Sequence, residues 1–451
     1  MKYLFYLGVF IVFNSYSQQL KPISNSFTEK LNVPNDFCGT DKIHREKLKS
    51  DREYRLRHSQ TIENIKQAQL VGKSRAGIYQ VPIVVHVMHK GEPIGEGTNI
   101  SDADVRAGIQ YLNNFWRKIP GTNGDGNGVD MEIEFALAVQ DENGDCTNGI
   151  DRVDMSNIVD YVDYGIDYNG GGLGIPDHDG DTDINSLKEY SNWDPTKYYN
   201  VWLVDEISNA NCYSGDAYTA GYAYYATEHG QPWDGSVVLI CSYLDESSDT
   251  WAHEMGHALN LPHTFDGDDV IVDGTYTCGE DYIDDTPQHI RTMYIDGLYN
   301  DCDNDDVNDC DPNFNEQMSP THIGNGTHQD HMHNYMDYTG CASEFTSGQR
   351  DVSKDALTNE RASYLPENGN TALLPPAIAE VDFSSSRTLG CNGMTVKFTD
   401  QSSCTPNTYL NEPINGITFN WLFDNGQDTP LTSSDQNPTI TFDNSGIYDV
   451  T

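Results

Sequence analysis

The alternation of apolar and polar residues divides the middle of the chain into strand-like and helix-like segments. Residues 79–87 form an almost unbroken apolar run, and shorter runs of this kind cover residues 131–139, 198–204 and 236–239. Apolar residues at helical spacing cover residues 101–117, 248–260 and 345–364, with Ser101 and Ser347 as the expected N-caps. Strands that alternate with helices over residues 76–365 predict one α/β (α+β) domain.

The two ends of the chain follow other patterns. In residues 1–17, Lys2 is followed by a short apolar run and then by small residues, as in a secretory signal peptide. No apolar run in the chain reaches the length of a membrane span. Residues 18–75 are mostly polar, with a thin apolar stripe at helical spacing over residues 42–69, which predicts a prosegment that packs on a partner surface. Residues 366–377 have linker composition, and residues 378–451 show the short alternating runs of an all-β sandwich.

Charge is distributed unevenly along the chain, whose net charge is −44. Residues 18–75 carry +5, from twelve Lys/Arg and seven Asp/Glu, which leaves −50 for residues 76–451 once Lys2 is counted. So acidic a surface excludes a nucleic-acid partner and offers the basic prosegment a complementary surface. Ten cysteines in an exported chain indicate disulfides rather than thiol chemistry.

The stretch from His253 to His263 carries the candidate chemistry. His253 and His257 are four residues apart, so a helix presents both imidazoles on one face, close enough for one zinc ion. Glu254 lies beside them, where a carboxylate can accept a proton from a water molecule on the metal. His263 joins them only if the helix ends first, and Asn260 and Pro262 favour such an end. A chance occurrence of the two histidines in an ordinary helix is the alternative, and the third histidine argues against it.

These residues resemble the zinc-binding consensus of the metzincin metallopeptidases, and the continuation His263-Thr264-Phe265 resembles the pappalysin family. The family usually has glycine at the position of Asn260. A second match is the segment 334–338, which resembles the family's methionine turn. The resemblance implies that Met336 forms an apolar floor below the zinc and that Tyr338 hydrogen-bonds the developing oxyanion.

The resemblance also implies disulfides and a calcium site after the zinc motif. By their order, the four cysteines of this region are expected to pair as Cys278–Cys310 and Cys302–Cys341, although the sequence alone allows three pairings. Asp281, Asp284 and Thr286 match positions that bind calcium in the family, and hard oxygen ligands suit that ion. The acidic runs 177–183 and 301–311 are weaker candidates and favour solvated turns. His322, His328, His331 and His333 fit no familiar ligand spacing and favour solvated loop positions over a second metal site.

Cys38-Gly39-Thr40 resembles the inhibitory segment of family prosegments, in which the thiolate occupies the zinc position that water needs. A disulfide from Cys38 to Cys146, Cys212 or Cys241 is the alternative. With Cys38 as a free switch, we expect bridges Cys212–Cys241 and Cys391–Cys404, and an odd number of remaining cysteines leaves one of Cys146, Cys212 and Cys241 unpaired. Small and basic residues around Arg75 and Ala76 predict the activation cleavage between them.

The sequence thus predicts a secreted zinc metalloendopeptidase that is made as a zymogen, acts on protein or peptide substrates and has its own prosegment as inhibitor. Arg75 and the acidic domain suggest cleavage next to Arg or Lys. Residues 378–451 resemble a polycystic-kidney-disease (PKD) repeat, an immunoglobulin-like sandwich, and the natural protein is expected to continue beyond Thr451. The alternative is a catalytically silent adhesin or binding module with a structural zinc.

Overall fold

The computed structural model describes residues 38–71, 77–167, 173–174, 187–208, 210–214, 218–270, 276–289, 291, 310, 333–368, 370, 373–374, 383–400, 420–426, 429–435 and 437–451. The expected signal peptide, the cleavage position Arg75–Ala76, Cys302 and Cys404 lie outside these residues. So do His322, His328, His331 and the acidic runs 177–183 and 301–309. None of the helices in the described part of the chain has the length and apolar character needed to cross a membrane.

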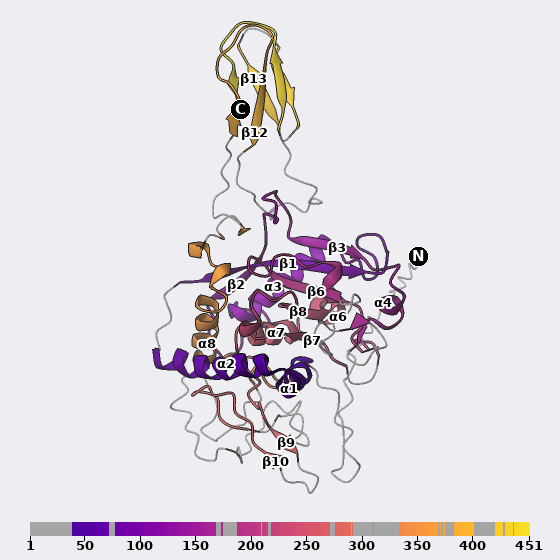
Figure 1. The fold of residues 1–451 in the computed structure, drawn as a ribbon, viewed down its shortest axis with the longest axis vertical. Coiled ribbons are helices and arrows are strands. Elements are labelled where there is room, and N and C mark those ends of the chain that lie inside the picture. Colours follow the sequence, from indigo (N-terminus) through magenta and orange to yellow (C-terminus); the bar gives the residue numbers. More distant parts are fainter. Residues whose placement is uncertain are drawn as a thin grey trace, which may run out of the picture.

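A mixed sheet forms the centre of the larger domain (Figure 1). Its strands lie in the order β2-β1-β6-β8-β7, and β3 pairs with the second half of β1. All strand pairs are parallel except that of the edge strand β7 with β8, which is antiparallel. The bounds are β1 Tyr79–His89, β2 Ile133–Leu137, β3 Ile150–Asp154, β6 Tyr199–Val204, β7 Gly221–Ala223 and β8 Ser236–Leu239.

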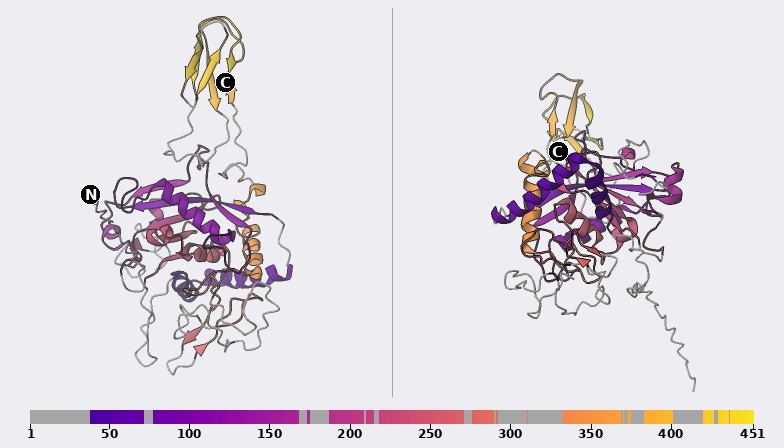
Figure 2. Two further views of the ribbon diagram at one scale, coloured as in Figure 1. Left: turned by 180° about the vertical axis from the view of Figure 1, so that it is seen from behind. Right: turned by 60° about the horizontal axis from the view of Figure 1, so that its bottom comes forward.

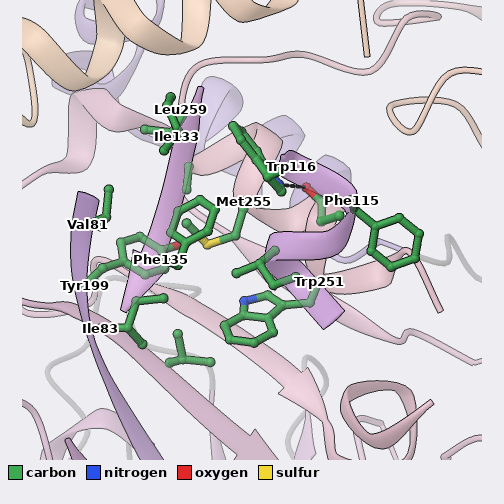
Figure 3. Close-up of a cluster of buried hydrophobic side chains, with 14 of the residues drawn as sticks. Val81, Ile83, Phe115, Trp116, Ile133, Phe135, Tyr199, Trp251, Met255 and Leu259 are labelled. Atoms are coloured by element: carbon green, nitrogen blue, oxygen red, sulfur yellow. Dashed lines mark hydrogen bonds between the residues drawn. The ribbon is translucent and has the colours of Figure 1, made fainter. Parts of the chain in front are cut away.

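The unbroken apolar run of β1 follows from burial on both of its faces. Val81, Ile83, Val85 and Val87 face a core shared with helices α3 (Asp102–Trp116) and α7 (Thr250–Ala258), whereas Met88 packs into a second cluster on the other face. Figure 3 shows Met255 and Leu259 of the α7 segment lying among residues of the sheet and α3. The indole of Trp116 donates to the carbonyl of Ala252 at 3.3 Å, which ties α3 to α7.

The predicted helix over residues 42–69 is two helices, α1 (Thr40–Ser50) and α2 (Arg52–Val71). The prediction of one helix was wrong because Asp51 has extended backbone and its carboxylate accepts from the N–H groups of Glu53 and Tyr54, which starts a new helix. α1 lies against β7, and α2 lies against α8 (Ser347–Thr358) and the 3-10 turn η1 (Ala226–Glu228) (Figure 1). Residues 38–71 therefore cross the domain beside the edge strand β7.

One of the two predicted helix N-caps is confirmed and the other is wrong. Ser101 caps α3 and forms a full capping box with Asp104, as predicted. α8 is capped by Thr346, not by Ser347, because the hydroxyl of Thr346 accepts from the N–H of Gln349 while the Gln349 side chain accepts from the N–H of Thr346.

Short elements complete the larger domain, and two views of their arrangement are given in Figure 2. The helices are α4 Val159–Tyr164, α5 Leu187–Tyr190, α6 Ile240–Leu244, and the 3-10 turns η4 Ala362–Tyr364 and η5 Pro366–Asn368. The strand pairs are β4 Ile166–Asp167 with β5 Leu173–Gly174, and β9 Asp269–Val270 with β10 Tyr276–Thr277.

The C-terminal residues form a separate antiparallel sandwich with its own core. One sheet has the order β11-β12-β15 and the other β14-β13-β16, and the described core residues are Val396, Phe398, Trp421, Phe423 and Phe442. The bounds are β11 Phe383–Ser385, β12 Met394–Asp400, β13 Trp421–Asp424, β14 Leu431–Ser433, β15 Thr439–Phe442 and β16 Asp449–Val450. The predicted fold class, an α/β domain followed by an all-β sandwich, is confirmed.

The cysteines confirm two predicted pairs and contradict a third. Cys212–Cys241 and Cys278–Cys310 are disulfides. Cys341 is also disulfide-bonded, and its expected partner Cys302 lies outside the described residues. Cys391 is a free thiol in an exposed turn before β12, so the predicted bridge Cys391–Cys404 is wrong. Cys146 is disulfide-bonded, so the unpaired cysteine expected among Cys146, Cys212 and Cys241 is not there either. In the loop after the zinc motif, the order of the cysteines thus predicted Cys278–Cys310, and the pairing of Cys302 with Cys341 stays a prediction.

Candidate metal centre and catalytic site

Four side chains converge on one point beside β7. The ligand atoms of Cys38, His253, His257 and His263 all lie within 4.8 Å of one another, and all four residues are buried. Among the described residues no other group of this kind is found. His253 and His257 come from α7, His263 follows the end of that helix, and Cys38 lies just before α1.

The end of α7 brings His263 back to the other histidines, as the sequence predicts. Asn260 has the left-handed conformation, with φ of 65°, and its side chain accepts from the N–H of Ala226 at 3.0 Å. The N–H of Leu261 donates to the carbonyl of Gly256 at 2.9 Å, which closes the last turn. Asparagine therefore supplies the backbone conformation for which the related family uses glycine.

The three imidazoles are arranged as zinc ligands. Their Nε2 atoms lie 3.0–3.2 Å apart, close to the ~3.3 Å between nitrogens bound to tetrahedral zinc at about 2.0–2.1 Å. The Nδ1 atom of His253 lies 2.6 Å from the carbonyl of Tyr335, and that of His257 lies 2.8 Å from the carbonyl of Leu261. An Nδ1–H that donates to a carbonyl fixes the tautomer in which Nε2 can bind metal. The residues present therefore fit Zn²⁺.

The residue next to the outer nitrogen of His263 comes from helix α1. Asp41 Oδ1 lies 2.7 Å from Nδ1 of His263, although the contact is not aligned as a hydrogen bond. Burial lowers the pKa of His253 to about 4, and it lowers the pKa values of His257 and His263 well below the usual range. All three imidazoles are therefore neutral near pH 7, as metal binding requires.

The methionine turn lies directly below the histidines. Met336 is fully buried, and its sulfur would lie 2.3 Å from a Cβ atom placed on Gly256. A side chain at this position of the zinc motif would displace Met336, so glycine allows the methionine to pack directly against α7. Two hydrogen bonds of 2.9 Å between the side-chain amides of Asn334 and Gln349 hold the turn against α8. The predicted role of Met336 as an apolar floor agrees with this packing.

Glu254 is buried beside Cys38 and Thr40. Its Oε2 accepts from the hydroxyl of Thr40 at 3.3 Å and lies 3.5 Å from the sulfur of Cys38. Its Oε1 is buried and has no hydrogen-bond partner within the described ranges, so one carboxylate oxygen can serve a water molecule or a substrate. Burial raises the pKa of Glu254 to about 8 and that of the Cys38 thiol well above its usual value. A divalent cation at the histidines would lower both, because it favours the charged forms.

Tyr338 contacts the backbone of Cys38. Its hydroxyl donates to the backbone carbonyl of Cys38 at 3.3 Å, and its ring lies 4.9 Å from that of His263, centroid to centroid. A peptide carbonyl in the cleft is therefore within reach of this hydroxyl, as the predicted oxyanion role requires.

The loop after the zinc motif brings together two of the three predicted calcium ligands. The hydroxyl of Thr286 donates to Oδ1 of Asp281 at 2.5 Å, whereas Oδ2 of Asp281 is buried without a hydrogen-bond partner in the described part of the chain. Asp284 is exposed, and its N–H donates to the side chain of Gln69 in α2. The orphaned carboxylate oxygen fits a cation ligand.

Sequence reasoning missed two residues that shape the site, Gly221 and Asp41. The N–H of Gly39 donates to the carbonyl of Gly221 at 2.8 Å, and a Cβ on Gly221 would lie 3.2 Å from Glu254. Asp41 contacts His263 as described above, beside Thr40 of the segment 38–40 that the sequence singled out. No local pattern marks Gly221 or Asp41, because each acts across more than 180 residues of sequence. Of the four loop histidines, only His333 is described, and its Nδ1 lies 3.1 Å from the carbonyl of Cys341.

Comparisons with known proteins agree with this geometry. Residues 181–358 match the peptidase family model described as Pregnancy-associated plasma protein-A. An extracellular metalloprotease of Colletotrichum graminicola is 31% identical over 159 residues, which are 32% of this chain and 47% of that relative. The match thus spans about half the length of the curated relative.

Solved structures of mirolysin from Tannerella forsythia are also similar to this chain. A promirolysin mutant is 24% identical, with a TM-score of 0.49 over 75% of this chain and 99% of its own. Mature mirolysin in complex with a cleaved peptide is 25% identical, with a TM-score of 0.43 over 67% of this chain and 100% of its own. The family match contains the three histidines, Glu254 and the methionine turn, and it therefore supports a pappalysin-like metzincin metallopeptidase over residues 181–358.

Proposed function

We propose that the protein is a secreted zinc-dependent endopeptidase that is made as a zymogen. The observation that carries this proposal is the set of three neutral imidazoles with converging Nε2 atoms, beside a glutamate that has one oxygen without a partner in the described residues. The edge strand β7 next to them can pair with an extended peptide. Secretion is supported by the disulfides and by the relative named as extracellular.

The mechanism follows from the positions of the side chains. Zn²⁺ bound by His253, His257 and His263 would acidify a water molecule and polarise the scissile carbonyl. Glu254 accepts the proton of the attacking water and delivers it to the leaving amine. The hydroxyl of Tyr338 donates to the oxygen on which negative charge develops. Met336 and Gly256 keep the base of the site apolar and closely packed.

The prosegment occupies the place of a substrate. Cys38 lies in parallel register with Gly221, its sulfur is among the histidine nitrogens, and its carbonyl accepts from Tyr338. A thiolate is a good zinc ligand and would exclude the water needed for hydrolysis. These contacts support the proposal that Cys38 keeps the chain latent until residues 18–75 are removed.

Release of the prosegment would follow cleavage between Arg75 and Ala76, and a basic residue at this position is consistent with hydrolysis next to Arg or Lys. Intact mass recorded against time for the purified chain, beside the variant Glu254→Ala, tests this. We expect only the wild type to shorten to a species that begins near Ala76. If neither protein shortens, another peptidase must release the prosegment, and self-processing is wrong.

We also propose that Asp281 and Thr286 bind calcium, with Asp284 as a further candidate. Burial raises the pKa of Asp281 well above its usual range, and the charge of Asp285 adds to this rise. A carboxyl with a raised folded-state pKa weakens the fold as pH rises and the group ionises, and a bound cation removes that cost. Calcium at about 1 mM should therefore raise Tm more at pH 8 than at pH 5.

The matched variant for the calcium prediction is Asp281→Asn, which retains an oxygen for Thr286 but carries no charge. We expect this variant to lose the gain in Tm from calcium at both pH values and, without calcium, to be at least as stable as the wild type at pH 8. An equal gain in both proteins would show that calcium binds elsewhere. Magnesium at the same concentration serves as the ion control.

A binding protein with a structural zinc is the second candidate, and one observation favours it. Cys38 completes a set of four protein ligands, which is the usual composition of structural zinc sites. The fourth ligand belongs to a segment that we expect to be removed, however, and Glu254 would have no role in such a site. The C-terminal sandwich, which we propose to be PKD-like, would then be the part that binds a surface or a polymer.

A further inference from the structure

The prosegment contacts the catalytic domain at a second charged site, beside the metal centre. Glu228, at the end of η1, is fully buried, and its carboxylate accepts from Nε and Nη2 of Arg57 at 2.7 and 3.2 Å. Nζ of Lys47 lies 3.9 Å from the same carboxylate. Both cations belong to the prosegment helices, Lys47 to α1 and Arg57 to α2.

Aromatic rings of the catalytic domain complete this site. Nζ of Lys47 lies 4.8 Å from the ring centroid of Tyr224 and 4.9 Å from that of Trp233, and the Trp233 indole donates to Glu228 at 3.1 Å. A buried carboxylate together with nearby aromatic rings is a favourable environment for an ammonium or guanidinium group. We refer to Glu228, Trp233 and Tyr224 as the cation seat.

The cation seat differs from a neighbouring buried acidic residue, Asp234, in where its cations come from. Asp234 is also buried, but Arg361 of the catalytic domain neutralises it with two hydrogen bonds of 2.6 and 2.8 Å. Within the described residues, both cations that pair with Glu228 come from helices α1 and α2 of the prosegment. Lys188 is the nearby cation of the catalytic domain, with Nζ 4.7 Å from the Tyr224 ring, and its ammonium donates to the carbonyl of Trp233. Burial lowers the pKa of Lys188 well below its usual value, so it competes weakly with a charged occupant.

The cation seat lies along the path of a peptide in the cleft. β7 is the edge strand that pairs with the prosegment next to the histidines. The chain then passes through Tyr225, whose ring centroid lies 5.6 Å from that of His257, and turns directly into η1. An extended peptide that continues along β7 past the metal site therefore approaches Glu228 within a few residues.

We propose that the cation seat recognises a lysine or arginine side chain of the peptide substrate, several residues away from the bond that is cut, and that Lys47 and Arg57 occupy it in the precursor. The inference rests on the proposed function, because it assumes that a peptide lies in the cleft. When the prosegment leaves, the buried carboxylate loses both cations, and a basic substrate side chain restores the pairing.

The test measures binding rather than cleavage. The chain carrying Glu254→Ala, which leaves peptides intact, is cut after Arg75 by limited trypsin treatment and separated from residues 18–75. The probes are short peptides of one neutral sequence in which a single lysine is moved through successive positions, beside the same peptides with acetyl-lysine, which lacks the charge. Fluorescence anisotropy gives Kd for each peptide.

At one position, lysine should bind about tenfold more tightly than acetyl-lysine. Glu228→Gln, which keeps the size of the side chain, should reduce this ratio to about one, and Tyr224→Leu should lower it about threefold. Glu134→Gln is the control, because it neutralises another glutamate paired with an arginine, on β2 at the opposite edge of the sheet. Binding of the acetyl-lysine peptide shows that each variant is folded.

Ratios near one at every position, or a lysine preference that persists in Glu228→Gln, would overturn the proposal. A third result would also overturn it. If Glu228→Gln weakens binding of a peptide of residues 38–71 but of no substrate peptide, the cation seat serves only to keep the precursor inactive. If peptides bind through the cation seat but the processed protein with an intact Glu254 cuts none of them, the proposed function fails and the cation seat stands.

Discussion

Replacing Glu254 by glutamine lowers kcat for peptide hydrolysis by about 10³-fold and leaves zinc binding unchanged. Glutamine retains the hydrogen bond from Thr40 but cannot accept a proton from water. The expected zinc ligands are the Nε2 atoms of the three histidines, which contact one another rather than the carboxylate. The measurement is kcat of the processed protein together with its zinc content.

The zinc content separates a chemical role of Glu254 from a structural one. A variant that loses activity and zinc together would show that Glu254 supports the site rather than the reaction. A variant that keeps both would contradict the assignment of the general base. His263→Ala is the matched comparison, since it removes a ligand and should lose zinc and activity in parallel.

Replacing Cys38 by serine raises the initial activity of the unprocessed chain by about 100-fold, which corresponds to a loss of about 3 kcal/mol in attachment of the prosegment. Serine has nearly the same size, but its hydroxyl is a poor zinc ligand. The remaining contacts of residues 39–41 with Gly221, Glu254 and His263 are retained, so the segment should stay partly bound. The measurement is the initial rate on a reporter peptide, with intact mass verifying that the chain is uncut.

Cys391→Ser is the control for this prediction. Cys391 is a free thiol in the C-terminal sandwich, so its replacement changes the thiol content equally without touching the cleft. Activity of the unprocessed chain should not change. If Cys38→Ser stays as inactive as the wild type, the thiol is not the inhibitory ligand, and the backbone pairing with β7 blocks the cleft by itself.

The parts of the site that depend on local spacing could be predicted from the sequence. His253 and His257 lie on one helix face, and Asn260 ends that helix because it tolerates positive φ, so the position of His263 followed from neighbouring residues. The methionine turn could be recognised because its five residues are contiguous. The apolar runs gave β1, β6 and β8 for the same reason.

The parts that depend on distant contacts could not be predicted. β7 has three residues and no periodicity, yet it is the strand on which the prosegment lies. Nothing in the neighbouring sequence distinguishes Asp41 or Glu228 from acidic residues on the surface. The fold places Asp41 beside His263 and Glu228 beside Arg57. Asp51 splits the prosegment helix through two backbone hydrogen bonds that compete with helix propensity. Whether Cys391 forms a disulfide likewise depends on which cysteines the fold places near it, and it is a free thiol.

The most direct test of the account is to incubate the processed protein with a mixture of unfolded proteins and to identify new peptide termini by mass spectrometry. The same incubation is carried out with Glu254→Gln and with protein stripped of metal by a chelator. We expect new termini with the wild type but not with Glu254→Gln or with the metal-stripped protein. Adding zinc to the stripped protein should restore them. Absence of new termini with wild-type protein that contains one zinc ion per chain would contradict it.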